Sequence, residues 1–257
     1  MRIPLLLLAV CPGLALAADG PDAGAAAAAP PAAPSAFAEM ETLWFQRDQP
    51  GAQDKLLQLT ADGVAQHPND FEYLWRAARI RLWAADGETG DKKRDIAKEA
   101  WDLGDRAMKA KPQAVEGNYY AAASIGSYSQ AVGILNALAQ GLESKFNERL
   151  DKAISIDSKY AHAAPPAVKG RYYYELPWPK RNLGKSVTWL NKALALDPSA
   201  LRPLLWLAET QWKDGDKQAA RASLAKLQAG SMPDDPAEER RCKALGKKLA
   251  EEMDKEH

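Results

Sequence analysis

The stretch from residue 199 to 228, SALRPLLWLAETQWKDGDKQAARASLAKLQ, predicts two short antiparallel helices that cannot bury their own apolar faces. Apolar side chains recur at helical spacing on both sides of an interruption at Gly215-Asp216. The positions are Leu204, Leu207 and Ala208 before the interruption and Ala220, Leu224 and Leu227 after it. Because one hairpin leaves its apolar face exposed, it needs neighbouring copies, and we expect a stack of such units.

Four further units of this kind precede residue 199, and together they predict an all-α fold with about five helical hairpins. The expected helices of the first two units are 36–47, 53–66, 71–86 and 96–111. Between the last two of these, residues 88–94 form a polar stretch that we interpret as a solvated loop. Small residues such as Gly104 predict a close approach between neighbouring helices.

The third and fourth units depart from the regular pattern. Residues 127–156 follow the helical segment that begins near residue 114, and we expect one long or broken helix there, with Gly126, Gly133 and Gly141 as candidate breaks. In the fourth unit, Pro165-Pro166 delays the first helix, and residues 176–179, Leu-Pro-Trp-Pro, exclude a helix. The second helix of that unit is expected over 183–198.

A charged helix that begins at Pro236 closes the expected stack as an end cap. Asp235 is its expected N-cap, and Glu238 is expected to complete a capping box. Cys242 lies among Arg240, Arg241 and Lys243, cations that would lower the pKa of its thiol. Without a nearby histidine, we interpret this cysteine as a passive thiol.

The two ends of the chain predict export. Residues 1–17 combine Arg2, an apolar run and a small-x-small site that ends at Ala17, which is typical of a cleaved secretory signal. An alternative is a lipoprotein signal with Cys11 acylated, although Val10 stands where that processing prefers a small residue. Residues 18–34, rich in alanine and proline, predict a flexible tether, and residues 35–257 the repeat domain. No later segment resembles a transmembrane helix.

Charge and composition argue against several classes of function. The chain has 34 basic and 34 acidic residues, so no basic excess favours nucleic acid or an anionic membrane surface. His67, His162 and His257 are scattered, which argues against a histidine-rich metal site and favours surface or cap positions for each. No nucleophile stands beside a base, and no acid/base pair is fixed by spacing. We therefore expect neither an enzyme nor a cofactor.

The hairpin pattern resembles the tetratricopeptide repeat. One unit ends in Ala-Leu-Ala-Leu-Asp-Pro at residues 193–198, and the next carries the Leu-Ala, Gly-Asp and Ala positions of that repeat. Pro68, Pro112 and Pro198 stand at its closing proline, while Ser158 replaces this proline in the third unit. The resemblance covers residues 35–228 and implies a solenoid with a concave binding surface.

Units three and four together carry a narrower resemblance. Their order of GNYYAAASIG, a long helix, KGRYYYELPWPKR and LNKALALDP is similar to two related families. One is the exported T component associated with TRAP-type solute transporters, and the other is the regulator of microtubule dynamics family. The predicted signal peptide favours the first and argues against a cytoskeletal role. The poor lipobox at Cys11 departs from the lipid anchor that T components often carry.

The resemblance implies that the first helix of each hairpin faces the concave surface. The groove-facing candidates are Trp75, Arg79, Tyr119, Arg171, Tyr174, Glu209 and Trp212, with Leu82 and Leu205 beside them. Trp178, between two prolines, either presents a recognition knob or fills a gap in the groove. Aromatic residues with arginine suit a peptide or solute groove, although large residues at helical spacing more often pack between repeats.

These observations predict an exported, non-enzymatic scaffold that binds a partner protein or a small solute in its groove. The T-component resemblance implies an accessory role in a solute transporter, with a solute-binding subunit as the partner. The alternative is a structural oligomer that assembles through the segment 127–156 and takes no ligand.

Overall fold

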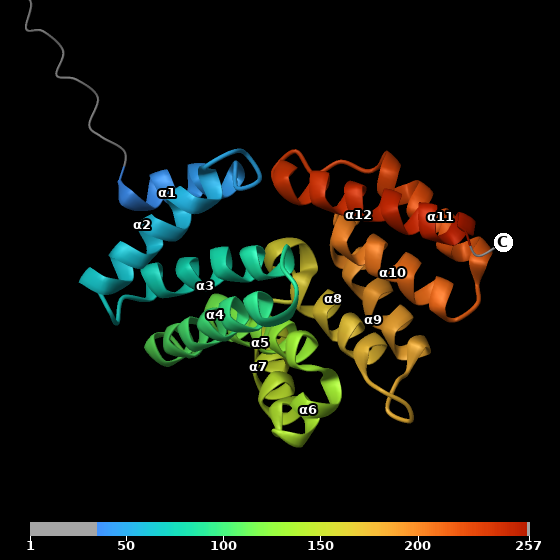
Figure 1. The fold of residues 1–257 in the computed structure, drawn as a ribbon, viewed down its shortest axis with the longest axis horizontal. Coiled ribbons are helices and arrows are strands. Elements are labelled where there is room, and N and C mark those ends of the chain that lie inside the picture. Colours follow the sequence, from blue (N-terminus) through green and yellow to red (C-terminus); the bar gives the residue numbers. More distant parts are fainter. Residues whose placement is uncertain (1–34, 256–257) are drawn as a thin grey trace, which may run out of the picture. The chain divides into compact units, whose positions relative to one another are not determined.

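The structure, a computed structural model, describes residues 35–255, and these residues form helices, turns and loops without a strand (Figure 1). In chain order the helices are α1 (Ala36–Phe45), α2 (Ala52–Gln66), α3 (Phe71–Asp86), α4 (Gly90–Ala110), α5 (Val115–Val132), α6 (Ile134–Ala139), α7 (Leu142–Ile156), α8 (Tyr160–Glu175), α9 (Leu183–Leu196), α10 (Leu201–Lys213), α11 (Lys217–Ala229) and α12 (Pro236–Lys255). The expected signal peptide, the acylation site at Cys11 and the tether lie outside the described residues.

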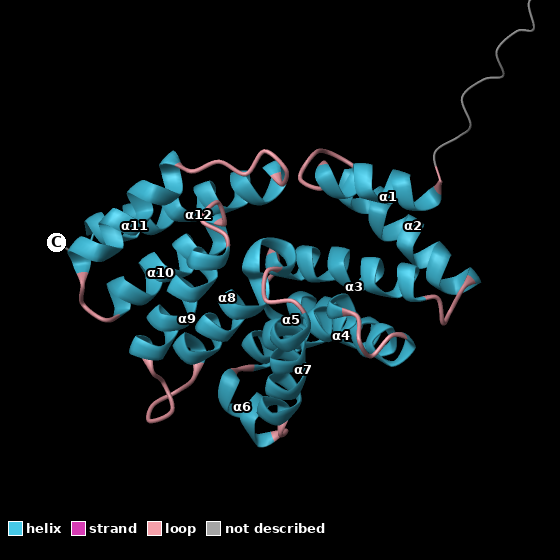
Figure 2. Cartoon of the chain, turned by 180° about the vertical axis from the view of Figure 1, so that it is seen from behind, coloured by secondary structure: helices cyan, strands magenta, loops and turns pink. Residues whose placement is uncertain are grey.

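Neighbouring helices pack as antiparallel hairpins joined by short connections (Figure 2). The pairs are α1 with α2, α3 with α4, α5 with α7, α8 with α9, and α10 with α11. The helix α12 follows and packs on α10 and α11. The predicted all-α stack of about five hairpins with a terminal helix is therefore confirmed.

Small residues let these hairpins approach closely, as the sequence predicts. A Cβ atom added to Gly104 of α4 would lie 2.6 Å from the backbone nitrogen of Ala121 in α5. In α8, a Cβ on Gly170 would lie 2.7 Å from Cγ of Leu190. Both distances are shorter than ordinary van der Waals contact, so these crossings require glycine.

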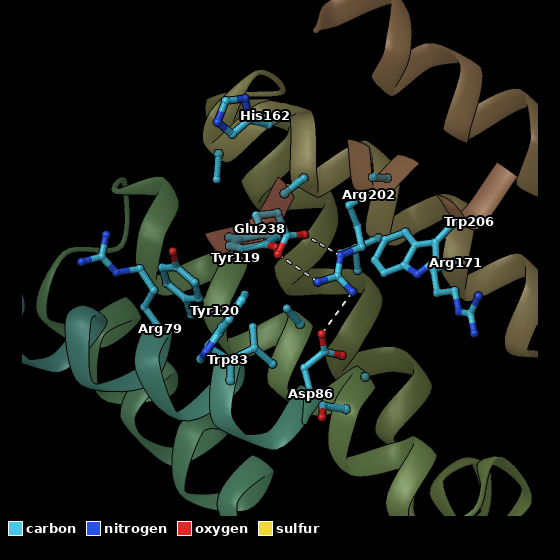
Figure 3. A pocket seen from close by; sticks show the side chains of 18 of the residues that line it. Arg79, Trp83, Asp86, Tyr119, Tyr120, His162, Arg171, Arg202, Trp206 and Glu238 are labelled. Atoms are coloured by element: carbon cyan, nitrogen blue, oxygen red, sulfur yellow. Dashed lines mark hydrogen bonds and ion pairs between the residues drawn. The ribbon is translucent and has the colours of Figure 1, made fainter. Parts of the chain in front are cut away.

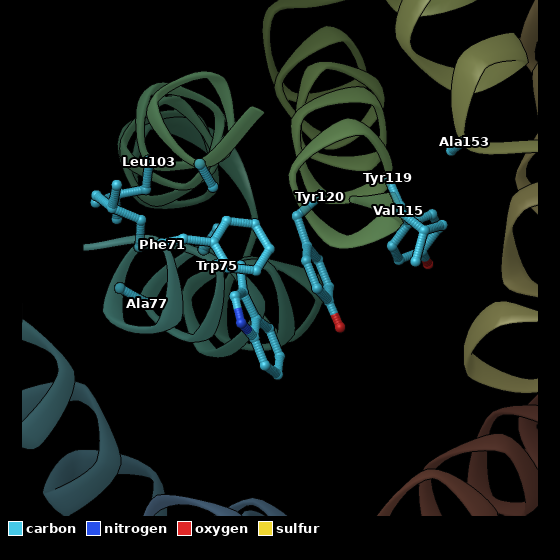
Figure 4. Close-up of a cluster of buried hydrophobic side chains, with 11 residues drawn as sticks. Phe71, Trp75, Ala77, Leu103, Val115, Tyr119, Tyr120 and Ala153 are labelled. Atoms are coloured by element: carbon cyan, nitrogen blue, oxygen red, sulfur yellow. The ribbon is translucent and has the colours of Figure 1, made fainter. Parts of the chain in front are cut away.

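The core between the second and third hairpins is rich in aromatic rings. Trp75 of α3 and Tyr120 of α5 stack with their centroids 6.3 Å apart and their planes 7° from parallel (Figure 4). Phe71 and Leu103 are buried in the same cluster. Each ring therefore contributes to packing between repeats, the alternative that the sequence leaves open for every aromatic candidate.

Two expectations about the irregular segments need correction or refinement. Residues 88–94 are not a loop, because α4 begins at Gly90 and includes Asp91–Arg94. No proline interrupts this run, and the pairs Lys92–Glu88 and Arg94–Asp91 join residues four and three positions apart, the spacing that supports a helix. In the third unit, the segment is broken at Gly133 and Gly141, which have φ angles of 89° and 70°. Gly126 lies inside α5. Self-assembly through this segment stays a prediction.

The first helix of the fourth unit begins with an unusual turn. Ala161, His162 and Ala163 have left-handed backbone angles, with φ between 46° and 60°. L-residues adopt this conformation at a cost of about 1–2 kcal/mol each. Regular helical geometry resumes only after these residues, where Pro165 and Pro166 stand. The predicted delay of this helix is confirmed, and the turn places His162 toward the inside of the stack.

The N-terminus of α12 agrees only in part with the sequence pattern. Asp235 Oδ1 accepts a hydrogen bond from the Glu238 backbone nitrogen at 3.1 Å, so the predicted N-cap is confirmed. The predicted capping box is wrong, because the Glu238 carboxylate turns instead to Arg202 of α10. A charged guanidinium competes more strongly for a carboxylate than a single backbone N–H does.

Candidate binding cavity

The first helices of the hairpins line a cavity of about 620 Å³. On each helix the lining positions recur at intervals of three and four residues, which describes one face turned inward. These positions are 75, 79, 82, 83 and 86 on α3, 116, 119, 120, 123 and 127 on α5, and 160, 164, 167, 168, 171 and 175 on α8. The volume falls within the range of about 300–1,000 Å³ that small-molecule pockets occupy.

Ion pairs join the C-terminal helix α12 and its N-cap to the first hairpin on one side of this cavity. Arg240 on α12 pairs with Asp48, in the turn after α1, at 2.5 Å. Asp235, the N-cap of α12, pairs with Arg47 at 2.7 Å. Figures 1 and 2 both show that turn next to the start of α12. A solenoid repeat ordinarily contacts only its neighbours, so these pairs between distant units add a further wall to the groove along the first helices.

A partly buried ionic network crosses the wall of the cavity, with Arg202 at its centre (Figure 3). Arg202 binds the Glu238 carboxylate through Nε and Nη2 at 2.6 and 3.0 Å. Its Nη1 lies 3.1 Å from Asp86 at the end of α3, and Arg241 reaches the same carboxylate at 3.3 Å. The network therefore links three helices, α3, α10 and α12.

The pKa values of this network follow from its charges. Burial alone would raise the pKa of Glu238, but the Arg202 guanidinium outweighs burial and holds that pKa below its ordinary value. The same balance lowers the pKa of Asp86. For Arg202, burial acts to lower the pKa, whereas Glu238 and Asp86 raise it well above the ordinary value. All three groups are thus charged at neutral pH.

Aromatic rings and aliphatic side chains form the remaining wall, and arginines cover some of the ring faces. The Arg241 guanidinium lies 3.1 Å from the centroid of the Trp83 ring, and Arg47 lies 4.1 Å from it. Deeper in the cavity, Tyr119, Tyr120 and Tyr160 pack edge to face, with centroids 5.0 to 6.2 Å apart. Tyr160 donates or accepts a hydrogen bond of 3.2 Å with the Tyr120 hydroxyl. Burial raises the pKa of Tyr119, so its hydroxyl is neutral.

Four of the eight residues predicted for the site line the cavity: Trp75, Arg79, Tyr119 and Arg171. The structure brings these four together from α3, α5 and α8. Each also has a packing or charge partner, as Arg79 does in a two-oxygen contact with Glu41 at 2.9 Å. Whether they bind a ligand stays a prediction.

The other four predicted residues lie outside this cavity. Glu209 pairs with Arg171, and the ring of Tyr174 lies 4.3 Å from the Arg171 guanidinium. Trp212 packs against the core of α10–α12. The side chain of Trp178 is 87% exposed, so it does not fill a gap in the groove. A binding role for these four residues is untested.

The face that α10 turns to the cavity explains two of these differences, those at Glu209 and Trp212. The expected groove positions were Leu205, Glu209 and Trp212, yet Leu205 is only 1% exposed, and Arg202 and Trp206 line the cavity instead. Neighbouring residues on a helix point about 100° apart, so a rotation by one position exchanges the groove face for the packing face. The sequence signal for the cavity-facing side of α10 was Trp206, an aromatic residue at helical spacing from Arg202.

Sequence reasoning also missed the positions of His162 and Cys242. His162 lines the cavity, with Nδ1 at 2.7 Å from Asp197 and Nε2 at 3.6 Å from Asp234, and so is neither a cap nor a free surface residue. Cys242 is buried, and burial raises the pKa of its thiol, opposite to the expected lowering. The thiol faces Glu238 at 3.4 Å rather than the neighbouring cations.

Within residues 35–255 the structure has no group of three or more His, Cys, Asp or Glu side chains placed to hold a metal ion. In the same part of the chain, the helices lack the combined length and apolar character that a membrane crossing requires. The cavity wall itself contains aromatic rings, hydroxyls and carboxylates.

Comparison with known proteins adds a family and a fold. The family model described as Regulator of microtubule dynamics protein 1-3 matches residues 38–254. The crystal structure of TTC0263, a thermophilic tetratricopeptide-repeat protein of Thermus thermophilus, is similar with a TM-score of 0.61 and 21% identity over 81% of this chain and 98% of that one. It confirms the repeat fold.

More remote similarity is found to MamA. One crystal structure of MamA has a TM-score of 0.45 and 14% identity over 70% of this chain and 90% of that one. MamA of Desulfovibrio magneticus RS-1, from residue 41 to its end, has a TM-score of 0.43 and 17% identity over 75% and 93%. Among curated proteins, no sequence matches the chain.

Proposed function

The chain belongs to the family described as regulator of microtubule dynamics protein 1-3, and from this premise we propose that it is a non-enzymatic scaffold that encloses a ligand in the cavity between its first helices and α12. The ligand is an organic molecule or a side chain of a partner protein. The cavity of about 620 Å³ carries this proposal. Concave, mostly apolar cavities with a few polar groups are the usual place for such ligands.

The tetratricopeptide-like fold supports a protein partner, because helical-repeat solenoids offer extended concave surfaces for binding. The closure by α12 supports a ligand that is small in at least one dimension. A folded domain does not enter 620 Å³, whereas a solute or one inserted side chain does.

A neutral fluorescent probe tests the proposal without knowledge of the natural ligand. N-phenyl-1-naphthylamine should bind the purified chain with one site and gain fluorescence, because the cavity removes it from water. The variant Ala123→Trp places a large ring on the cavity face of α5 and should abolish this signal. The matched variant Ala225→Trp, on the exposed face of α11, should bind as the wild type does.

Circular dichroism of both variants shows whether each keeps its helices. Loss of probe binding in Ala123→Trp with unchanged helicity supports the cavity as the binding site. Equal binding by both tryptophan variants would refute it.

We also propose that the chain is exported and serves as an accessory subunit of a solute transporter. The signal-like residues 1–17 and the resemblance of units three and four to T components support this role. The family's name refers instead to microtubule dynamics. Fractionation of cells that express the full chain, followed by affinity purification from the envelope fraction, distinguishes a transporter role from a cytoskeletal one. A cytoplasmic chain that co-purifies with tubulin would overturn export and the transporter role together.

A further inference from the structure

Carboxylates outnumber arginines in the cavity wall. The wall contains five arginines and eight carboxylate residues, a formal excess of three negative charges. All five arginines already have a carboxylate partner: Arg47 has Asp235, Arg79 has Glu41, Arg171 has Glu175, and Arg202 and Arg241 share Asp86. The positive charges of the cavity wall are thus already balanced by carboxylates.

Glu116 is different, because this cavity-lining carboxylate has no hydrogen bond or ion pair to another described residue. It stands in the first turn of α5, where the exposed backbone N–H groups favour a negative charge. The first-turn N–H groups take the place of a cation beside this side chain. It also leaves the carboxylate oxygens free to accept hydrogen bonds inside the cavity.

Aromatic rings surround the same place. Tyr119 and Tyr120 lie three and four residues after Glu116, on the same face of α5, and Tyr160 packs against both rings. The Tyr119 hydroxyl has no hydrogen-bond partner among the described residues. A free carboxylate beside tyrosine rings provides the contacts that an ammonium group uses, charge-assisted hydrogen bonds and ring faces.

We propose that the cavity selects ligands with a primary ammonium group at the end of an apolar body, and that Glu116 receives the ammonium while the tyrosine and tryptophan walls hold the body. The ligand is a free amine or the side chain of a lysine on a partner. This inference rests on the proposed function of the cavity and adds the chemistry of its ligand.

Displacement of bound N-phenyl-1-naphthylamine measures the preference directly. Octylamine, octanol and octanoate have one chain length and differ in charge at neutral pH. Octylamine should displace the probe at a concentration about 10- to 100-fold lower than octanol, because a hydrogen bond to a charged group contributes more than one between neutral groups. Octanoate should be the weakest of the three.

The variant Glu116→Gln keeps the shape of the side chain and removes its charge. It should reduce the advantage of octylamine over octanol to about twofold or less. The matched control Glu148→Gln, on the exposed face of α7, should keep the full preference. Loss of probe binding in Glu116→Gln would instead mark a structural role for this residue and overturn the inference.

A capped peptide with one lysine, compared with its acetyl-lysine form, separates the two sources of the ammonium group. If the lysine peptide displaces the probe and the acetyl-lysine peptide does not, the site is assigned to a partner protein. If octylamine displaces the probe and neither peptide does, the site is assigned to a free amine. If the wild type binds the probe but treats octylamine and octanol alike, the inference is wrong and the cavity function stands. If the probe and octylamine both fail to bind, both proposals fall.

Discussion

Replacement of Arg202 by methionine should strongly destabilise the closed stack of hairpins. The guanidinium forms a two-bond contact with Glu238 at 2.6 and 3.0 Å and reaches Asp86 at 3.1 Å, so its loss leaves the Glu238 carboxylate buried without its main cation. Arg202 stands in the first turn of α10, where a positive charge is unfavourable. Its carboxylate partners are therefore what stabilises it there.

The size of the effect follows from the exposure of the partners. The side chains of Arg202 and Glu238 are 19% and 16% exposed, and that of Asp86 is 40% exposed. Breaking a buried pair by removal of one partner costs about 3–5 kcal/mol, and partial exposure of Asp86 favours the lower end. With an m value of about 3 kcal/mol/M for a chain of this size, the urea midpoint should fall by about 1 M.

Urea titrations of the purified chain, followed by tryptophan fluorescence and circular dichroism, provide the measurement. The double variant Arg202→Met/Glu238→Met should recover most of the loss, since it removes the uncompensated charge as well. The matched control Arg94→Met removes an exposed arginine and should keep the wild-type midpoint. A single variant Arg202→Met as stable as the wild type would refute the reasoning, because desolvation would then offset the whole attraction.

The pH dependence of stability tests the same network. Burial raises the pKa of Glu238, but Arg202 outweighs it, and the pKa in the folded chain lies below the ordinary value of 4.5. A carboxylate with a lowered pKa stabilises the fold above its unfolded pKa, and this contribution is lost as the pH falls through the folded value. The difference in unfolding free energy between wild type and Arg202→Met should therefore shrink below about pH 4. A constant difference across this range would contradict the assignment.

Three further perturbations have clear expected outcomes. Gly104→Ala should destabilise the chain by about 1–3 kcal/mol in urea titrations, because its methyl group would overlap the backbone of Ala121, whereas Gly184→Ala meets only ordinary contacts and should not. The buried thiol of Cys242 should resist iodoacetamide in the folded chain and react after unfolding in urea; rapid labelling of the native chain would contradict its burial and raised pKa. Trp178→Ala should change the unfolding free energy in urea titrations by less than about 0.5 kcal/mol, since this side chain is exposed, and a larger loss would reveal packing that the structure lacks.

The sequence was sufficient for features that depend on neighbouring residues. The hairpin 199–228 divides at Gly215, whose φ angle of 89° favours glycine, into α10 and α11. The breaks at Gly133 and Gly141 follow from the same local chemistry. Sequence motifs likewise resembled both the family and the repeat fold.

Features that depend on the rotation of a helix or on distant contacts were not predictable in this way. Periodicity shows that α10 has an apolar face, but Leu205 and Trp206 differ by one position, and only the packing of α12 decides which faces the cavity. The helical start of α4 at Gly90 was missed because polar composition alone does not separate a loop from an exposed helix with paired charges. The contact of Arg240 with Asp48 joins residues 192 positions apart, and no sequence pattern specifies it.

The closure by α12 connects stability to ligand binding. An open solenoid gains its stability from contacts between adjacent repeats, whereas here the pairs Arg202–Asp86 and Arg47–Asp235 add contacts between units that are distant along the chain. The same pairs lie beside the cavity, so a ligand that contacts both α5 and the α12 side stabilises this arrangement of the helices. By linkage, such a ligand stabilises the fold in proportion to its affinity for the closed form. The amine that Glu116 is proposed to receive would thus stabilise the contact between the first helices and α12. By the same coupling, weakening of the Arg202 network would weaken amine binding, although Arg202 itself does not contact the ammonium.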